Sequence, residues 1–210
     1  MYLSRSGIEE LPRKKRLNII NSISGIKPAV LIGTRSSEGH ANLSIVNSTV
    51  HIGSNPAMLG YILRPLGEVR RHTYENILST EVFTVNHIHR SFIEKAHYTS
   101  AKFEAEVSEF DSCDLTEEYR DSFEAPFVKE SLLKIGLRHV ETVKVESNDT
   151  LLVIGAIEHL TIPDFAVDER GYIDLGAIED VGISGLNSYY SLKKIAEFPY
   201  ARVEELPDFK

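Results

Sequence analysis

The chain has 210 residues, a formal net charge of −8 and 42% hydrophobic residues, which matches a folded protein of one domain or two small ones. The excess of acidic side chains excludes a protein that coats duplex nucleic acid, because such binding depends on cations that neutralise phosphates. Cys113 is the single cysteine, so no intrachain disulfide can form. No apolar run approaches the roughly 20 residues that cross a bilayer, and we expect a cytoplasmic protein without a membrane span.

The N-terminal segment predicts a helix from about Ser6 to Gly25. Ser6 and Glu9 have the spacing of a capping box. Apolar residues then recur at helical spacing at Leu17, Ile20 and Ile23. The four consecutive cations at 13–16 suit a nucleic-acid or lipid contact in principle, but in an acidic protein we favour a solvated helix face.

From Pro28 onward, short apolar runs alternate with turn residues, which is typical of strands. Six runs are predicted as strands, at 29–34, 42–52, 57–63, 82–86, 137–146 and 151–162. Few strong helix patterns lie between them. The series favours a mainly β fold, an antiparallel barrel or sandwich with peripheral helices.

The predicted strand 42–52 is unusual because its apolar period changes. Apolar residues occupy odd positions up to Ile45 and even positions from Val46, which indicates one inserted residue, a β-bulge. One face then carries a row of polar side chains: Asn42, Ser44, Asn47, Thr49 and His51. Such a row suits a solvated face, or a ligand site, since bulges also occur beside sites.

Residues 70–80 predict a short helix with an anion pocket at its start. Thr73 is placed at the N-cap and Glu75 in the first turn. The free N–H groups of that turn, beside Arg70, Arg71 and the Thr73 hydroxyl, suit a phosphate or a carboxylate. The alternative is a solvated arginine pair and a cap that touches no ligand.

Two further segments complete the predicted elements. The acidic segment 111–124 is expected to leave the barrel, and the spacing of Leu192, Ile195 and Ala196 predicts a helix over 188–196. The chain lacks the glycine motifs of phosphate-binding loops, Rossmann sites and serine hydrolases. His87 and His89 have no further ligand at a suggestive spacing, so no metal site is expected.

Taken in order, several segments resemble the flavin reductase-like family, the FMN-binding split-barrel flavoproteins that include flavoredoxin-type proteins and the reductase components of two-component monooxygenases. The main likeness is His72-Thr73-Tyr74-Glu75-Asn76-Ile77 followed by Glu81-Val82-Phe83-Thr84-Val85-Asn86. Further likeness lies at 31–34, 39–44, 55–61, 108–110, 125–131, 184–190 and 199–202. His72 departs from the family, which usually has Asp there, and the segment 61–65 is less typical than its neighbours.

The resemblance implies a single FMN-binding split-barrel domain over 1–210, with the barrel at about 26–165 and a C-terminal extension at 166–210. It implies that Arg71, Thr73 and the following helix hold the FMN phosphate, with Asn76 supporting that turn. Further cofactor-binding residues are expected along the isoalloxazine ring and ribityl chain: Asn42, Ser44, Asn47, Ser48, Thr49 and Tyr61.

The resemblance also implies an NAD(P)H:flavin reductase-like activity, in which NADH or NADPH passes a hydride to FMN and the electrons leave to an acceptor. That acceptor would be a second flavin, oxygen or a partner oxygenase, and the chain would form a homodimer. No catalytic side chain is assigned, because the cofactor carries the reaction. Two alternatives remain on the same fold: a non-catalytic flavin-binding or interaction domain, and a pyridoxamine-phosphate-oxidase-like enzyme.

Overall fold

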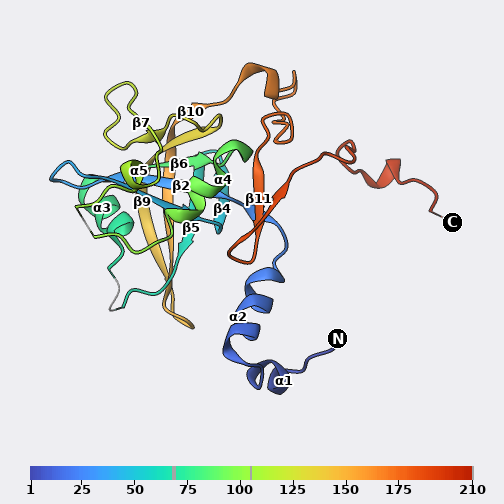
Figure 1. Cartoon of the computed structure of the whole chain (residues 1–210). Coiled ribbons are helices and arrows are strands. Elements are labelled where there is room, and N and C mark those ends of the chain that lie inside the picture. Colours follow the sequence, from blue (N-terminus) through green and yellow to red (C-terminus); the bar gives the residue numbers. More distant parts are fainter. Residues whose placement is uncertain (68–69, 105, 210) are drawn as a thin grey trace.

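A computed structural model describes residues 1–67, 70–104 and 106–209 of the chain (Figure 1). The helices are α1 (Arg5–Glu9), α2 (Arg13–Ser22), α3 (His72–Thr80), α4 (Ile93–Tyr98) and α5 (Glu109–Ser112). The strands are β1 (Lys27–Pro28), β2 (Val30–Arg35), β3 (Ala41–Val46), β4 (Thr49–Ser54), β5 (Ala57–Leu63), β6 (Val82–His87), β7 (Glu117–Glu118), β8 (Phe127–Val128), β9 (Lys134–Val145), β10 (Thr150–Thr161), β11 (Val181–Ser184) and β12 (Ser188–Ser191).

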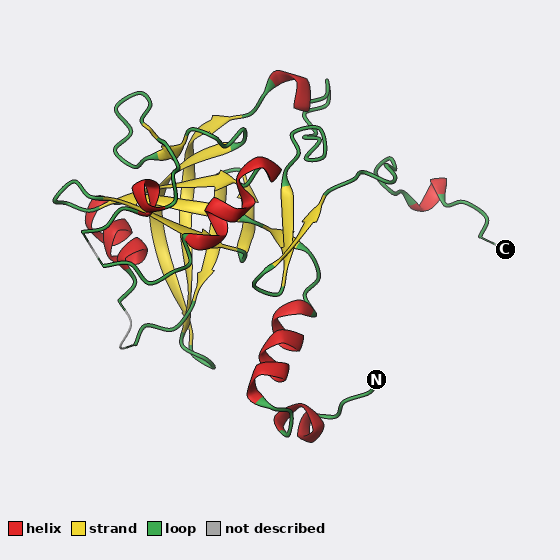
Figure 2. Ribbon diagram, viewed as in Figure 1, coloured by secondary structure: helices red, strands yellow, loops and turns green. Residues whose placement is uncertain are grey.

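The centre of the molecule is a seven-stranded antiparallel sheet in the order β3-β2-β6-β9-β10-β5-β4. Its two edge strands, β3 and β4, follow each other in the chain and are separated only by Asn47 and Ser48. The sheet therefore curls round from one edge to the other without a hydrogen-bonded ladder between them, which is a split barrel with helices at its periphery (Figure 2). The prediction of a mainly β antiparallel barrel is confirmed.

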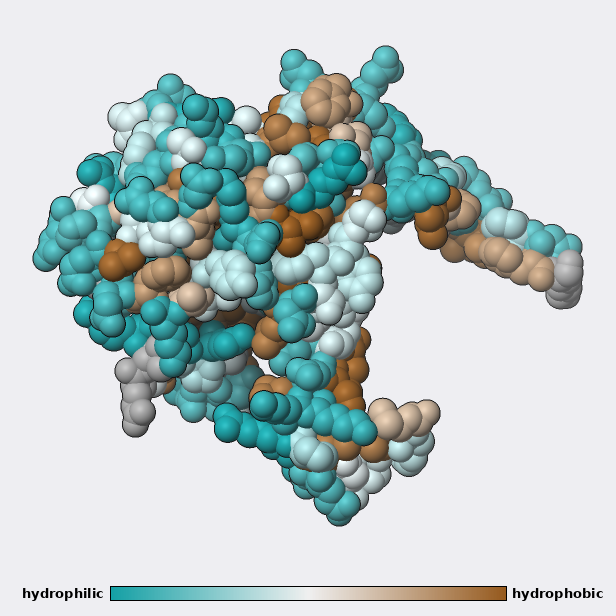
Figure 3. Space-filling view, in the orientation of Figure 1, coloured by the Kyte–Doolittle hydropathy of each residue, from teal (hydrophilic) through white to brown (hydrophobic). Residues whose placement is uncertain are grey.

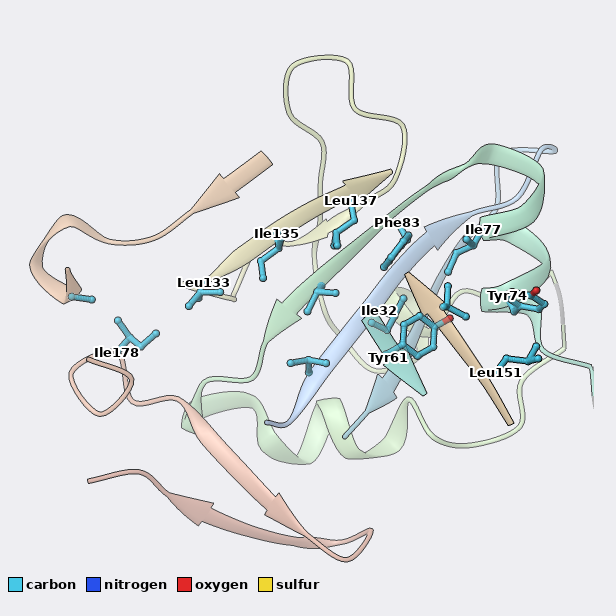
Figure 4. Close-up of a cluster of buried hydrophobic side chains, with 14 residues drawn as sticks. Ile32, Tyr61, Tyr74, Ile77, Phe83, Leu133, Ile135, Leu137, Leu151 and Ile178 are labelled. Carbon is cyan, nitrogen blue, oxygen red and sulfur yellow. The ribbon is translucent and has the colours of Figure 1, made fainter. Parts of the chain in front are cut away.

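The barrel interior is filled by apolar side chains from strands that are distant in sequence. Ile32, Tyr61 and Phe83 lie in one buried cluster (Figure 4). At Gly155, where the β9–β10 ladder shifts register, a Cβ atom would lie 2.8 Å from the Phe83 ring. Glycine is therefore required there, because the two backbones and the ring approach too closely for a side chain.

A second buried cluster covers the other face of β2 and β3. It includes Leu31 and Leu43 from the sheet, Phe92 and Phe110 from the helical segments, and Ile183 from β11. This cluster fixes α5 against β3. The two elements are the ones that bring Glu109 next to Asn42, a contact that shapes the site described below.

The strand predicted over 42–52 is two strands, and the predicted bulge between Ile45 and Val46 is wrong. β3 pairs with β2, and β4 pairs with β5 on the opposite edge of the sheet. The change of apolar period therefore marks a corner, where the chain leaves one edge and joins the other. A register shift does occur nearby, but it lies between His51 and Gly53 in β4.

The predicted N-terminal helix is divided in two at Pro12, which stands at the N-cap of α2. Ser4, not Ser6, caps α1, since its Oγ accepts a hydrogen bond from the Gly7 N–H at 3.2 Å. Proline cannot donate the N–H that a continuous helix needs at that position. The helix predicted over Ser6 to Gly25 is therefore wrong in its boundaries and its cap.

The helix predicted over 188–196 is wrong. Residues 188–191 form β12, which pairs with β11, and the chain beyond them has no regular structure until a short 3-10 turn at Val203–Glu205. Tyr189 packs edge-on against the His97 ring. The strand ladder and this packing override the helical spacing of the apolar residues.

Two segments project away from the barrel and from each other (Figure 1). We call residues 1–22, which include α1 and α2, the N-terminal arm, and residues 192–209 the C-terminal arm. None of the helices in the described part of the chain has the length and apolar character needed to cross a bilayer. The division into a barrel at 26–165 and an extension at 166–210 stays a prediction.

Candidate functional site

A cavity of about 450 Å³ opens where the split edge of the barrel meets the start of α3. This volume lies within the range of small-molecule sites. Its walls come from β3, the two residues after β3, the end of β5, the segment 70–73 and the loop at 99–104. Glu109 of α5 completes the lining.

Seven of the nine side chains predicted to bind the cofactor line this one cavity: Asn42, Ser44, Asn47, Ser48, Tyr61, Arg71 and Thr73. Thr49 and Asn76 are outside the lining. Thr49 begins β4 and pairs with Tyr61 in the ladder. Asn76 is buried in α3, where its Nδ2 donates to Thr34 Oγ1 at 3.1 Å, so it supports the wall from behind.

Helix α3 begins at His72, and the residue at its N-cap is Arg71 rather than the predicted Thr73. No side chain caps this end of the helix. The first N–H groups that bond back to the Arg71 carbonyl are those of Tyr74 and Glu75. The N–H groups of His72 and Thr73 precede them, and such groups at a helix start attract anions.

The Thr73 hydroxyl is held by a network that begins at Glu109. Asn42 Nδ2 donates to both carboxylate oxygens of Glu109 at 2.9 Å, and the Leu43 N–H donates to one of them at 2.8 Å. The Asn42 amide oxygen therefore faces the other way, where it accepts from Thr73 Oγ1 at 2.8 Å and from Thr34 Oγ1 at 3.2 Å. One carboxylate thus sets the direction of each of these hydrogen bonds.

Glu109 is the main site residue that the sequence did not reveal. Its side chain is buried, and this burial raises the pKa of its carboxyl group, opposed by the hydrogen bonds that it accepts. The segment 108–110 carried only a family likeness. A lone acidic residue in a negatively charged chain gives no signal of burial until its neighbours in space are known.

Two polar atoms at this cavity are buried without any hydrogen-bond partner in the described part of the chain, namely Tyr61 Oη and Arg71 Nε. Burial also raises the pKa of the Tyr61 hydroxyl. A buried polar group without a partner costs about 1–3 kcal/mol. Both atoms belong to residues of the same lining, so they indicate a cavity shaped for a ligand that supplies the missing partners.

The free edge of β3 adds backbone groups to the cavity. The Leu43 N–H points away from β2, toward Glu109. In an antiparallel strand, residues two apart direct their N–H and C=O groups to the same side. Ile45, which also lines the cavity, therefore presents a donor and an acceptor on the side where β3 has no partner strand.

Basic side chains predominate at the cavity although the chain as a whole is acidic. The lining includes Arg64, Arg70, Arg71 and Lys102, against Glu104 and Glu109. Arg70 is engaged by Glu75 in an ion pair. A local excess of cations raises the concentration of anionic ligands near the site.

His87 and His89 are each engaged by a carboxylate. His87 Nδ1 lies 2.7 Å from Asp180 Oδ2, and His89 Nε2 lies 3.0 Å from Glu179 Oε2. Within residues 1–67, 70–104 and 106–209, no group of three potential ligands is arranged to hold a metal ion. These pairs fix the segment before β11 to the end of β6.

The model of the flavin reductase like domain matches residues 25–175 of the chain. The solved structure of a protein from Shewanella frigidimarina NCIMB 400, provisionally described as a flavin reductase with a split barrel domain, is 47% identical, with a TM-score of 0.92 over 96% of this chain and 100% of that one. An uncharacterised protein of Aquifex aeolicus is 24% identical over 165 residues, which are 78% of this chain and 83% of that protein.

Two more distant structures share the fold. Component B of nitrilotriacetate monooxygenase from Bacillus cereus is 17% identical, with a TM-score of 0.81 over 94% of this chain and 98% of that one. Flavoredoxin of Desulfovibrio vulgaris is 20% identical, with a TM-score of 0.71 over 84% of this chain and 92% of that one.

Proposed function

This chain belongs to the flavin reductase-like family, and from that premise we propose that it binds FMN in the cavity between β3 and α3 and works as an NAD(P)H:flavin oxidoreductase. One observation carries the proposal. Tyr61 Oη and Arg71 Nε are buried and lack partners within the described residues, and both belong to residues that line the same cavity. A ligand with an anionic end and a polar aromatic end would satisfy both atoms.

The phosphate end of FMN would lie at the start of α3. Arg71 supplies a charged donor, and the N–H groups of His72 and Thr73 precede the first bonded turn of the helix. Charge-assisted hydrogen bonds to a phosphate are roughly twice as strong as neutral ones. The Thr73 hydroxyl proton is directed to Asn42, so in this arrangement Thr73 contributes mainly through its backbone.

The ring and ribityl chain would extend along the free edge of β3. Ile45 offers a backbone donor and acceptor, and Ser44, Asn47 and Ser48 border the same space. Tyr61 also belongs to this lining, and its hydroxyl is buried without a hydrogen-bond partner among the described residues. When bound, FMN supplies the hydride-accepting chemistry, so the chain's own task is to bind, orient and desolvate the ring.

The hydride donor in this proposal is NADH or NADPH. The acceptor is a partner oxygenase, oxygen or another flavin, and the similarity to a monooxygenase component B supports the first of these. In the family the site lies near a homodimer interface, and we propose a homodimer here as well. The same fold also suits a flavin carrier without reductase activity, which the experiment below separates.

An absorption titration tests the proposal. Purified protein is mixed with FMN, and binding is followed by the shift of the flavin absorption bands and the quenching of flavin fluorescence. NADH or NADPH is then added in the absence of oxygen. We expect the flavin absorption near 450 nm to decrease within a few turnovers. Absence of binding at excess FMN would refute the site, whereas binding without bleaching by either nucleotide would refute the reductase activity alone.

A further inference from the structure

The C-terminal arm carries an unusual amount of exposed apolar surface. Six large side chains along it are between 64% and 92% exposed: Ile195, Phe198, Tyr200, Val203, Leu206 and Phe209. Brown, hydrophobic residues follow the arm along its length in the space-filling view (Figure 3). A tail that evolved to remain solvated would be rich in polar residues instead, so this surface indicates a partner.

Within the described residues, the N-terminal arm buries none of its side chains against its own chain. Helix α2 has no buried residue. Leu17, Ile20 and Ile23, the residue at the C-cap of α2 just beyond the arm, recur every third position and are 47%, 46% and 72% exposed. Such a stripe on a helix normally faces a packed neighbour, and the C-terminal arm of the same chain projects elsewhere (Figure 1).

The two arms have complementary charge. The N-terminal arm has five cations and two acidic residues, including the consecutive cations Arg13, Lys14, Lys15 and Arg16. The C-terminal arm, residues 192–209, has three cations and four acidic residues, and its distal part at 198–209 has one cation, Arg202, and three acidic residues. Pairing α2 with α2 of another copy would bring two runs of four cations together, which is unfavourable. The distal part of the C-terminal arm is apolar and has more acidic residues than cations, so it suits both the charge and the stripe of α2.

We propose that two copies of the chain dimerise by exchanging arms, so that the C-terminal arm of each copy lies along α2 of the other. Such a contact is formed twice around a two-fold axis. A stable interface buries about 800 Å² per partner. The six exposed apolar side chains of one C-terminal arm provide an area of about that size, because each aromatic side chain contributes about 150 Å² or more.

Arm exchange specifies the contacts of the homodimer in the proposed function, but it depends on no property of the flavin site. Its test needs no flavin, so its failure leaves FMN binding intact, and loss of FMN binding leaves the dimer intact.

Charge reversal tests the pairing directly. One variant carries Lys14→Glu with Lys15→Glu, and the other carries Glu204→Lys with Glu205→Lys. In a homodimer of either variant, both contacts between a C-terminal arm and α2 would bring like charges together. We therefore expect the dimer dissociation constant, measured by sedimentation velocity at low salt, to rise at least tenfold. An equimolar mixture restores both contacts in the heterodimer, which native mass spectrometry identifies by mass.

Recovery of heterodimers from the mixture supports exchange between copies, because a contact within one chain is not repaired by mixing. The proposal is overturned if the parent protein is monomeric, if the variants remain as dimeric as the parent, or if the mixture contains no more heterodimer than chance association of the two variants predicts.

A second pair of variants addresses the apolar contact. Phe198→Ser with Tyr200→Ser should weaken the dimer at least tenfold while the thermal transition of the barrel remains cooperative. Phe165→Ser is the matched control, since Phe165 is 72% exposed but lies outside both arms, and it should leave the dissociation constant within about twofold. If Phe165→Ser weakened the dimer as much as Phe198→Ser with Tyr200→Ser, the proposed role of the C-terminal arm would be overturned.

Discussion

The two edge strands of the barrel, β3 and β4, are joined by only two residues but lie in opposite surroundings. On β3, Leu43 is fully buried and its outward N–H is bonded to Glu109. On β4, Val50 and His51 are exposed. One edge is enclosed by α3 and α5, and the other is open.

This difference shows that an unpaired strand edge is not itself a binding site. β3 is the proposed FMN site because a buried carboxylate orders Asn42 and Thr73 beside a helix start, while Ile45 directs its backbone N–H and C=O away from β2. Within the described residues, β4 packs mainly against β5. Substitutions around β3 should therefore control FMN affinity, and substitutions on β4 should not.

The largest effect on binding is expected from Arg71→Ala combined with Thr73→Ala. The change removes a charged donor and the hydroxyl that ties the start of α3 to Asn42, and it should weaken FMN binding by about 3 kcal/mol, roughly a hundredfold. Flavin fluorescence quenching measures the dissociation constant. Arg70→Ala is the control, because Arg70 is already paired with Glu75, and it should change affinity less than about threefold. Similar losses in both variants would refute the phosphate position.

Replacing Glu109 with Ala should destabilise the protein by about 2–3 kcal/mol. The substitution leaves the Leu43 N–H and the Asn42 amide without their acceptor in a buried place. Urea unfolding followed by circular dichroism measures the loss. Glu130→Ala is a useful comparison, since that carboxylate also accepts a backbone N–H, from Thr116, but the hydrogen bond is exposed to solvent, and its loss should cost under 1 kcal/mol.

The pH dependence of the unfolding free energy of Glu109→Gln tests the burial of this carboxyl group. Because burial raises the pKa of Glu109 in the folded state, the folded protein binds this proton more tightly than the unfolded chain does. The contribution of Glu109 to stability is therefore full below the unfolded pKa of about 4.3 and declines as pH rises through the folded pKa. Since Gln cannot ionise, the unfolding free energy of the variant relative to the parent should rise over this pH window. A constant difference from pH 4 to 7 would contradict the burial effect.

The sequence predicted more of this enclosed edge than of its surroundings. The polar residues of β3 and the start of a helix after Arg70 follow local rules of strand alternation and helix capping, and the sequence predicts both, although it places the N-cap at Thr73 rather than at Arg71. The corner after Val46 was detected as a change of period but misread as a bulge, since alternation alone does not distinguish one bent strand from two. Glu109 and β12 depend on contacts between distant segments, with Asn42 and with β11, and no local pattern reports such contacts.

Tyr61→Phe should raise the stability of the flavin-free protein and weaken its binding of FMN. Removing a buried hydroxyl without a partner should raise the unfolding free energy of the flavin-free protein by about 1 kcal/mol, while FMN loses one hydrogen bond and binds several-fold more weakly. Tyr189→Phe is the control, because the Tyr189 hydroxyl lies 3.0 Å from His97 Nδ1 and its removal should lower stability. A destabilised Tyr61→Phe variant would show that the hydroxyl already has a favourable environment without ligand.

The smallest effect is expected on β4, at a position that the sequence assigned to the cofactor. Thr49 is not among the described residues that line the cavity, although its chain neighbour Ser48 and its ladder partner Tyr61 are, so Thr49→Ala should keep the FMN dissociation constant within about twofold. Asn42→Ala on β3 should raise it about tenfold, because Asn42 links Glu109 to Thr73 and a lost hydrogen bond of this kind is worth about 1–1.5 kcal/mol. The same fluorescence titration ranks the two variants. If Thr49→Ala weakened binding as much as Asn42→Ala, the open edge would contribute to the site, and the contrast between the two strands would fail.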